Sequence, residues 1–164
     1  MGFLLLVVAL VGLLLAACTA YQTLFLIPGL VSLRRRPGRT GASGAPRTRF
    51  VVLVPAHNEA ALIGESVASL LRSSYPPELR EVLVIADNCG DDTAARARLV
   101  GATRHERPGL RLRGKPHALD WMISRLDLLR FDAVVIVDGD TKVDPQFLRA
   151  MDAHLASGEK AIQG

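Results

Sequence analysis

Residues 51–59 read VVLVPAHNE, and they give the first indication of the fold. Together with Phe50, the first of them form a continuous apolar run that Pro55 ends. Such a run is typical of a strand that is buried on both faces of a parallel sheet. Apolar residues then recur at helical spacing over residues 59–72, which predicts a helix directly after the strand. A buried strand followed at once by a helix is the repeating unit of an α/β domain.

The same alternation continues along the rest of the chain. Further apolar runs predict strands at residues 82–86 and 133–137. A weaker pattern predicts a third strand at residues 103–106, and residues 161–163 are expected to begin another. Helical patterns predict a helix from Asp91 or Asp92 to about Leu99, one over residues 116–128, and one that opens at Asp144. Strands that alternate with helices predict an α/β fold with a mostly parallel sheet and flanking helices.

Three polar segments follow predicted strands, at residues 55–59, 87–92 and 138–141. In open α/β sheets, ligands bind outside the carboxyl ends of the strands. The polar side chains of these three segments are therefore the main candidates for binding and chemistry.

Asp138 and Asp140 flank Gly139 directly after the last strong strand pattern. Two carboxylates at a strand end can hold a divalent metal, and hard oxygen ligands suit Mg²⁺ or Mn²⁺ on a diphosphate. The alternative is a turn before a capped helix, although Asp144 already supplies that cap. An EF-hand loop is excluded, because Lys142 stands where that loop requires a ligand.

Asp87 directly follows the second predicted strand, where it is placed either to accept a hydrogen bond from a ligand or to serve the local structure. Lys115 directly precedes a predicted helix, and the N-terminus of a helix favours phosphate groups. Residues 109–115 match the first seven positions of a P-loop, but Pro116 replaces the Ser or Thr that this motif needs for its metal. We therefore reject the P-loop and keep Lys115 as a phosphate contact.

The first 33 residues contain no charged side chain, and residues 3–33 are nearly all apolar, which is long enough to span a bilayer. A cleaved signal peptide, or a lipoprotein anchor at Cys18, fits less well, because no basic residue precedes the apolar core. We expect residues 1–33 to be a transmembrane anchor. Six arginines and no acidic residue follow within residues 34–49, which predicts a cytoplasmic location for the next domain, at a bacterial inner membrane.

Residues 34–48 form a basic linker rich in Gly and Pro, and residues 49–164 form one domain. Residues 50–164 hold all 16 acidic residues and only 14 of the 20 basic ones. The basic pI of about 9.6 therefore comes from the linker, and we expect no nucleic-acid partner.

In combination, the motifs of residues 49–164 resemble those of family-2 glycosyltransferases with a GT-A (Rossmann-like) fold. Four segments carry the resemblance, and they occur in the family's order. They are VVLVPAHNE at residues 51–59, VIADNCGDDT at 84–93, RGKPHAL at 113–119 and VDGD at 137–140.

The resemblance implies a nucleotide-sugar donor, commonly UDP-linked, and Mn²⁺ or Mg²⁺ as the cofactor. It implies that Asp87 recognises the base and that Lys115 approaches the nucleotide or its phosphates. Asp138 and Asp140 would hold the metal, Asp140 most directly, and Asp138 would also contact the donor. The implied frame of the nucleotide pocket, with Glu59 near the ribose or base, consists of Pro55, Ala56, Asn58 and Glu59.

Family members transfer the sugar with inversion to a glycan or lipid acceptor, and a carboxylate base deprotonates the acceptor hydroxyl. The resemblance places that base beyond Gly164, so we expect no catalytic base in this chain. We therefore expect the donor-binding half of a longer membrane-anchored enzyme, inactive alone. A non-catalytic nucleotide-sugar-binding module or decayed gene product is the alternative. A nucleotidyltransferase is a distant third, because its Gly-rich basic loop does not follow the first predicted strand.

Overall fold

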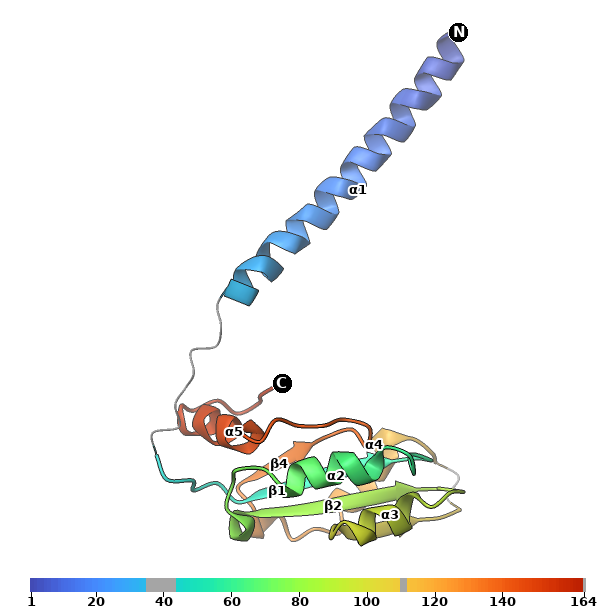
Figure 1. Cartoon of the computed structure of the whole chain (residues 1–164). Helices are drawn as coiled ribbons and strands as arrows, with labels where there is room; N and C mark the ends of the chain where they lie inside the picture. The colour runs from blue at the N-terminus through green and yellow to red at the C-terminus, as the bar shows by residue number, and fades with distance from the viewer. Residues whose placement is uncertain (35–43, 110–111, 164) are drawn as a thin grey trace. The chain divides into compact units, whose positions relative to one another are not determined.

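The computed structural model describes residues 1–34, 44–109 and 112–163, and it divides into two units, residues 1–41 and 42–164. The described part of the first unit holds one helix, α1 (Gly2–Arg34) (Figure 1). Among the described residues, α1 is the one helix that is long and apolar enough to cross a membrane. The predicted anchor is therefore helical, and its passage through a bilayer stays a prediction. Most of the predicted linker, residues 35–43, lies outside the described residues.

The second unit is built on a four-stranded sheet whose strands are all parallel. The strand order is β3-β2-β1-β4, with β1 in a central position. The strands are β1 (Phe50–Ala56), β2 (Arg80–Asp87), β3 (Thr103–Arg107) and β4 (Ala133–Ile136). All seven residues of β1 are buried, as a run of apolar residues between two neighbouring strands requires. The predicted α/β fold with a parallel sheet is confirmed.

Helices cover both faces of the sheet (Figure 1). On one face, Phe50, Val52 and Val54 pack with side chains from α2 (Ile63–Leu71), α3 (Thr93–Leu99) and α5 (Phe147–Ala156). On the other face, Val51 and Leu53 pack with α4 (Lys115–Ile123). Side chains alternate between the faces of a strand, so β1 supplies both cores. Two short 3-10 helices, Pro77–Leu79 and Leu128–Arg130, precede β2 and β4.

Several predicted boundaries were wrong. The helix predicted over residues 59–72 begins only at Ile63, because residues 59–62 form a turn closed by hydrogen bonds from Leu62 and Ile63 to the Glu59 carbonyl. The helix predicted over residues 116–128 ends at Ile123. The predicted strand at 161–163 has no regular structure in the chain as described.

The strand predicted at residues 133–137 forms, but its burial on both faces was wrong. Val134 and Ile136 are 42% and 47% exposed, whereas Ala133 and Val135 pack under α5 and its neighbours. The reason is position, because β4 lies at the edge of the described sheet and α4 does not extend across it. Edge and central parallel strands share the same apolar sequence pattern.

Candidate functional site

A cavity of about 580 Å³ opens at the carboxyl ends of β1, β2 and β4. We call it the carboxyl-edge pocket. Its lining residues come from all four segments that the sequence singled out. They are Pro55, Ala56, His57, Glu59, Asp87, Arg113, Gly114, Lys115, Asp138 and Asp140. Of the eight predicted site residues, only Asn58 is absent from this lining.

Asn58 instead ties two loops together. It adopts a left-handed backbone conformation with φ 55°, which Asn tolerates better than most residues, and its Oδ1 accepts a hydrogen bond of 2.8 Å from the Gly90 amide. Two parallel contacts reinforce this link, from the Glu59 amide to Thr93 Oγ1 at 2.9 Å and from the Ala60 amide to Asp91 Oδ2 at 3.1 Å. The loops after β1 and β2 therefore hold each other in place beside the pocket.

His57 adds a fourth link between the same loops. Its Nδ1 lies 2.6 Å from the Asp87 carbonyl oxygen. A carbonyl oxygen only accepts hydrogen bonds, so Nδ1 carries the proton and donates. The histidine ring thus braces the end of β2 and also lines the pocket.

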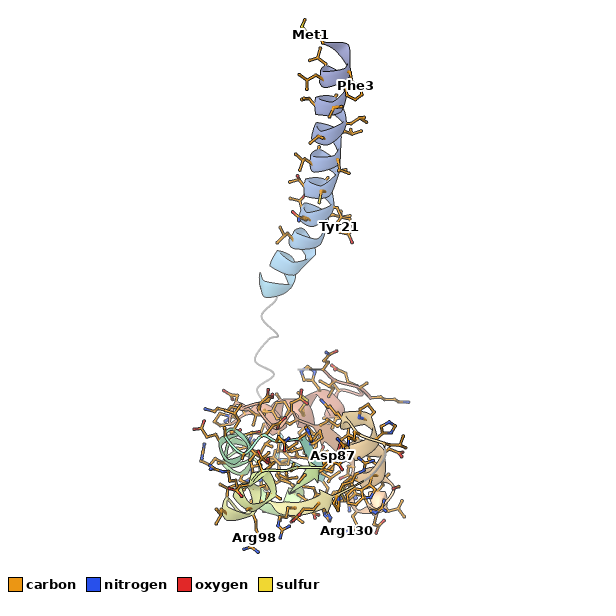
Figure 2. The ribbon with its side chains drawn as sticks, turned by 90° about the vertical axis from the view of Figure 1, so that its right-hand side faces the viewer. Met1, Phe3, Tyr21, Asp87, Arg98 and Arg130 are labelled. Atoms are coloured by element: carbon orange, nitrogen blue, oxygen red, sulfur yellow. The ribbon has the colours of Figure 1, made fainter. Side chains whose placement is uncertain are left out.

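Asp87 lies among the packed side chains of the domain, whereas Arg98 and Arg130 lie at its margin (Figure 2). Arg107 Nη1 donates to Asp87 Oδ1 at 2.6 Å, and the two side chains are only 4% and 7% exposed. Asn88 Nδ2 also donates to Oδ1, at 2.8 Å, and the Gly114 amide donates to Oδ2 at 3.2 Å. The Asp87 carboxylate therefore joins the end of β3 to the segment that leads into α4.

Lys115 and Asp138 meet across the pocket, where Lys115 Nζ pairs with Asp138 Oδ1. Both side chains are about half exposed, at 48% and 56%, so the pair stays open to a ligand. Asp140 is also exposed, and its Oδ1 lies 3.4 Å from Thr141 Oγ1. Asp138 thus has a basic partner within the chain, and Asp140 presents its carboxylate to the pocket.

Glu59 is the acid of the pocket that has a buried oxygen, Oε2, without a hydrogen-bond partner in the described part of the chain. Burial, followed by repulsion from Asp140 and Asp138, raises the pKa of Glu59. A Cβ atom placed on Gly139 would lie 1.8 Å from Glu59 Oε2, so the absence of a side chain at Gly139 makes room for this carboxylate.

The donor set of the pocket fits a divalent metal that is completed by a ligand. No group of three or more His, Cys, Asp or Glu side chains within residues 1–34, 44–109 and 112–163 is arranged to hold a metal by itself. Mg²⁺ and ions like it bind through one or two carboxylates together with substrate phosphates and water. Asp140, with Asp138 beside it, supplies hard oxygen ligands of this kind.

Sequence reasoning missed Arg107, Thr93 and Gly139 as parts of the site. Arg107 ends β3, one residue beyond the strand predicted from the sequence, so the carboxyl-end rule was not applied to it. Thr93 and Gly139 act through contacts with Glu59, at separations of 34 residues and more, which no local pattern reveals.

A larger cavity of about 960 Å³ lies along β4 and α5. It borders the exposed side of the edge strand, and its lining includes the apolar residues Val134, Ile136 and Met151. It shares only Asp138 with the carboxyl-edge pocket. The smaller pocket is the better candidate, because polar groups converge on it at the strand ends.

The chain is similar to known glycosyltransferases over most of its second unit. It is 30% identical over 124 residues to a beta-monoglucosyldiacylglycerol synthase of Synechocystis sp., covering 71% of this chain and 25% of that protein. It is 32% identical over 132 residues to the glycosyltransferase AglD of Haloferax volcanii, covering 76% of this chain and 20% of that protein. The chain thus spans a quarter or less of the curated relatives it matches.

Solved structures show the same fold. The mannosyltransferase PcManGT of Pyrobaculum calidifontis, in complex with GDP-Man and Mn²⁺, superposes with a TM-score of 0.60 at 29% identity, over 70% of this chain and 34% of that one. The glucosyl-3-phosphoglycerate synthase of Mycobacterium tuberculosis, with Mn²⁺, UDP and glucosyl-3-phosphoglycerate, superposes with a TM-score of 0.56 at 28% identity, over 68% and 41% of the two chains.

A family model described as "Glycosyltransferase like family 2" matches residues 46–164, which include the whole sheet and every residue of the carboxyl-edge pocket. The order of elements, the GT-A neighbours and this match agree with one another. The chain therefore belongs to the family-2 glycosyltransferases.

Proposed function

We propose that the carboxyl-edge pocket binds a nucleotide-sugar, most simply a UDP-sugar, together with Mn²⁺ or Mg²⁺. In this proposal the chain supplies the donor site of an inverting glycosyltransferase that acts on a glycan or lipid acceptor. One observation carries the proposal: seven predicted donor-site residues, from three strand ends and the start of α4, line one cavity of about 580 Å³. A cavity of this size suits a small-molecule ligand.

Each predicted donor-site residue that lines the pocket has a proposed role that its position supports. Pro55 and Ala56 frame the nucleotide from the end of β1, and Glu59 lies against the ribose. Asp87, at the end of β2, accepts a hydrogen bond from the base. Lys115 precedes the rest of α4 and turns from Asp138 to the diphosphate when the donor binds.

Asp140 is the proposed ligand of the metal, and Asp138 supports it. When bound, the metal neutralises the negative charge that develops on the departing diphosphate. Lys115 is the first residue of α4, and its ammonium group stabilises the same negative charge on the diphosphate.

The four carboxylates of the pocket all have donor-side roles in this assignment. None is left to deprotonate an acceptor hydroxyl, so we propose that the chain by itself transfers little sugar and that the base is supplied from outside it. The same donor pocket without transfer would serve as a nucleotide-sugar-binding module, and turnover assays separate the two functions. We also propose that α1 anchors the domain to a membrane, with the arginines from Arg34 on the cytoplasmic side.

The test is calorimetric titration of the full chain, in detergent micelles, with UDP in the presence and absence of Mn²⁺. We expect binding that requires Mn²⁺ and that Asp140→Ala abolishes. Asp120→Ala is the matched control, because Asp120 is exposed on α4 and does not line the pocket. A folded wild-type chain that binds no nucleotide with Mn²⁺ would refute the proposed donor site.

A further inference from the structure

We propose that Arg107, at the end of the outer strand β3, is a positioning residue that fixes the Asp87 carboxylate for reading the nucleotide base. The inference rests on the proposed function, in which Asp87 accepts a hydrogen bond from that base. Arg107 does not touch the donor in this proposal. It acts through Asp87 and through the segment that follows β3.

The geometry of the guanidinium supports such a role. Arg107 Nη1 donates to Asp87 Oδ1 at 2.6 Å, and Nη2 donates to the Leu112 carbonyl at 2.8 Å. One planar group thus holds both the acid at the end of β2 and the segment that leads into α4. An arginine fork has a fixed geometry and stays charged, so it sets an orientation that a flexible lysine does not reproduce.

Burial makes this orientation specific. The side chains of Arg107 and Asp87 are only 4% and 7% exposed. A buried charge that loses its partner is strongly disfavoured, so the two groups hold each other in one arrangement. The other ion pair of β3, between Arg104 and Glu106, is exposed on 33% and 55% of its side chains and lacks this constraint.

The hydrogen bonds already made leave Asp87 little freedom. A carboxylate offers about four acceptor positions. Arg107 and Asn88 occupy two of them on Oδ1, and the Gly114 amide occupies one on Oδ2. The position that remains on Oδ2 can receive one N–H group from the pocket, which Asp87 lines.

A single fixed acceptor discriminates between the pyrimidine bases. Uracil presents an N3–H donor, whereas the same ring atom of cytosine is an acceptor that a carboxylate repels. A site built to make such a hydrogen bond rejects an analogue that lacks the donor. Arg107 therefore determines the preference for UDP over CDP, whereas a purely structural role would weaken the binding of both nucleotides equally.

The test compares UDP and CDP affinities of the full chain in detergent with Mn²⁺, for the wild type and for Arg107→Met, Arg107→Lys and Asp87→Asn. Arg107→Lys keeps a buried charge beside Asp87 and so protects the fold, but it loses the fork. Arg104→Met is the matched control on the same strand. Thermal unfolding of each variant shows whether it is folded.

We expect the wild type to bind UDP about tenfold or more tightly than CDP, since the loss of one hydrogen bond to a charged group lowers affinity by about that factor. The preference should fall towards one in both Arg107 variants and in Asp87→Asn, and it should persist in Arg104→Met. A folded Arg107→Lys chain with the full wild-type preference would overturn this inference and leave the proposed function intact. Equal binding of UDP and CDP by the wild type would also overturn this inference, whereas the proposed donor site fails only if the folded wild type binds neither nucleotide.

Discussion

Gly139→Ala is the most informative single substitution in the pocket, because the room at Gly139 is filled by another residue's carboxylate. The new Cβ would lie 1.8 Å from Glu59 Oε2, 3.0 Å from its Cδ and 3.2 Å from the Cβ of Ala56. Gly139 has no positive φ, so alanine fits its backbone and the conflict is steric. The end of the flexible Glu59 side chain must turn away.

Two effects on stability then oppose each other. An unfavourable rotamer of Glu59 costs about 0.5–1.5 kcal/mol. Release of the buried, unpartnered Oε2 to water returns about 1–3 kcal/mol. The net change in the free energy of unfolding should therefore lie between a loss of about 0.5 kcal/mol and a gain of about 2.5 kcal/mol. Binding has no such compensation, because losing the proposed hydrogen bond from a ribose hydroxyl to the Glu59 carboxylate weakens UDP affinity by about 10- to 100-fold.

The assay is a double-mutant cycle with Glu59→Ala, measured by UDP titration with Mn²⁺ and by thermal unfolding. Adding Gly139→Ala to Glu59→Ala should change UDP affinity by no more than about twofold, because the two closest conflicting atoms, Oε2 and Cδ of Glu59, are gone and only the contact of 3.2 Å with the Ala56 Cβ remains. Gly64→Ala is the control, since its Cβ meets open space on α2 and should leave affinity unchanged. If Gly139→Ala weakens binding equally in both backgrounds, the loop itself has moved and the steric argument fails.

Three further predictions concern other contacts. Asp132→Asn removes the ion pair with Arg49 that lowers the pKa of Asp132 to about 2. The substitution should lower the free energy of unfolding by less than about 1 kcal/mol at neutral pH. This stabilisation is complete above the ordinary pKa of 3.8 and is lost as the pH falls through about 2. The difference in melting temperature between the wild type and Asp132→Asn should therefore disappear between these two pH values. A difference in melting temperature that persists below about pH 2 would contradict a stabilising ion pair. Tyr75→Phe removes a hydrogen bond of 2.9 Å to the Thr48 carbonyl and should cost about 1 kcal/mol in urea unfolding. Burial raises the pKa of Tyr75 to about 12, so a cost that varies below about pH 10 would speak against this account. Lys115→Met should weaken UDP binding about tenfold in titrations at low salt. The effect should be smaller at high salt, since the Lys115 side chain is half exposed and salt screens its charge. An effect that does not depend on salt would exclude an electrostatic contact.

The sequence predicted the central strands well because their physical requirement is local. A parallel strand between two neighbours must be apolar on both faces, and Phe50–Ala56 satisfies this with every residue buried. Ile63, Val67 and Leu70 recur at helical spacing and are all fully buried on α2. Fold class therefore followed from patterns within short windows of the chain.

Element ends and exposure depended on distant contacts and could not be predicted in the same way. The helix was predicted to begin at Glu59, but α2 begins at Ile63. Thr93 and Asp91, some 30 residues later, accept hydrogen bonds from the amides of Glu59 and Ala60 and hold them outside the helix. Likewise, nothing within residues 133–137 distinguishes an edge strand from a central one, so the exposure of β4 came from the arrangement of the sheet.

All the predicted site residues except Asn58 line one pocket, because the carboxyl-end rule is a property of the sheet and not of side-chain detail. The rule does not say how a carboxylate is held once it reaches the edge. Asp87 was open to a binding or a structural reading from sequence, and the structure gives it structural contacts with Arg107 and Gly114 while leaving it at the pocket wall. The two readings are therefore compatible, since the structural contacts orient the acid.

The charge of the pocket argues for a divalent cation in donor binding. Four carboxylates line it against two basic side chains, Arg113 and Lys115. Lys115 pairs with Asp138 and Arg107 pairs with Asp87, which leaves Glu59 and Asp140 without a basic partner among these groups. A nucleoside diphosphate is itself strongly negative, so it would meet net repulsion in this pocket without a compensating ion. Burial is the main cause of the raised pKa of Glu59, and repulsion from Asp140 and Asp138 adds to it before any ligand enters. A divalent cation at Asp140 would change the sign of this interaction, and so the affinity for UDP should depend far more on Mn²⁺ than the affinity for neutral uridine, which carries the base and ribose alone.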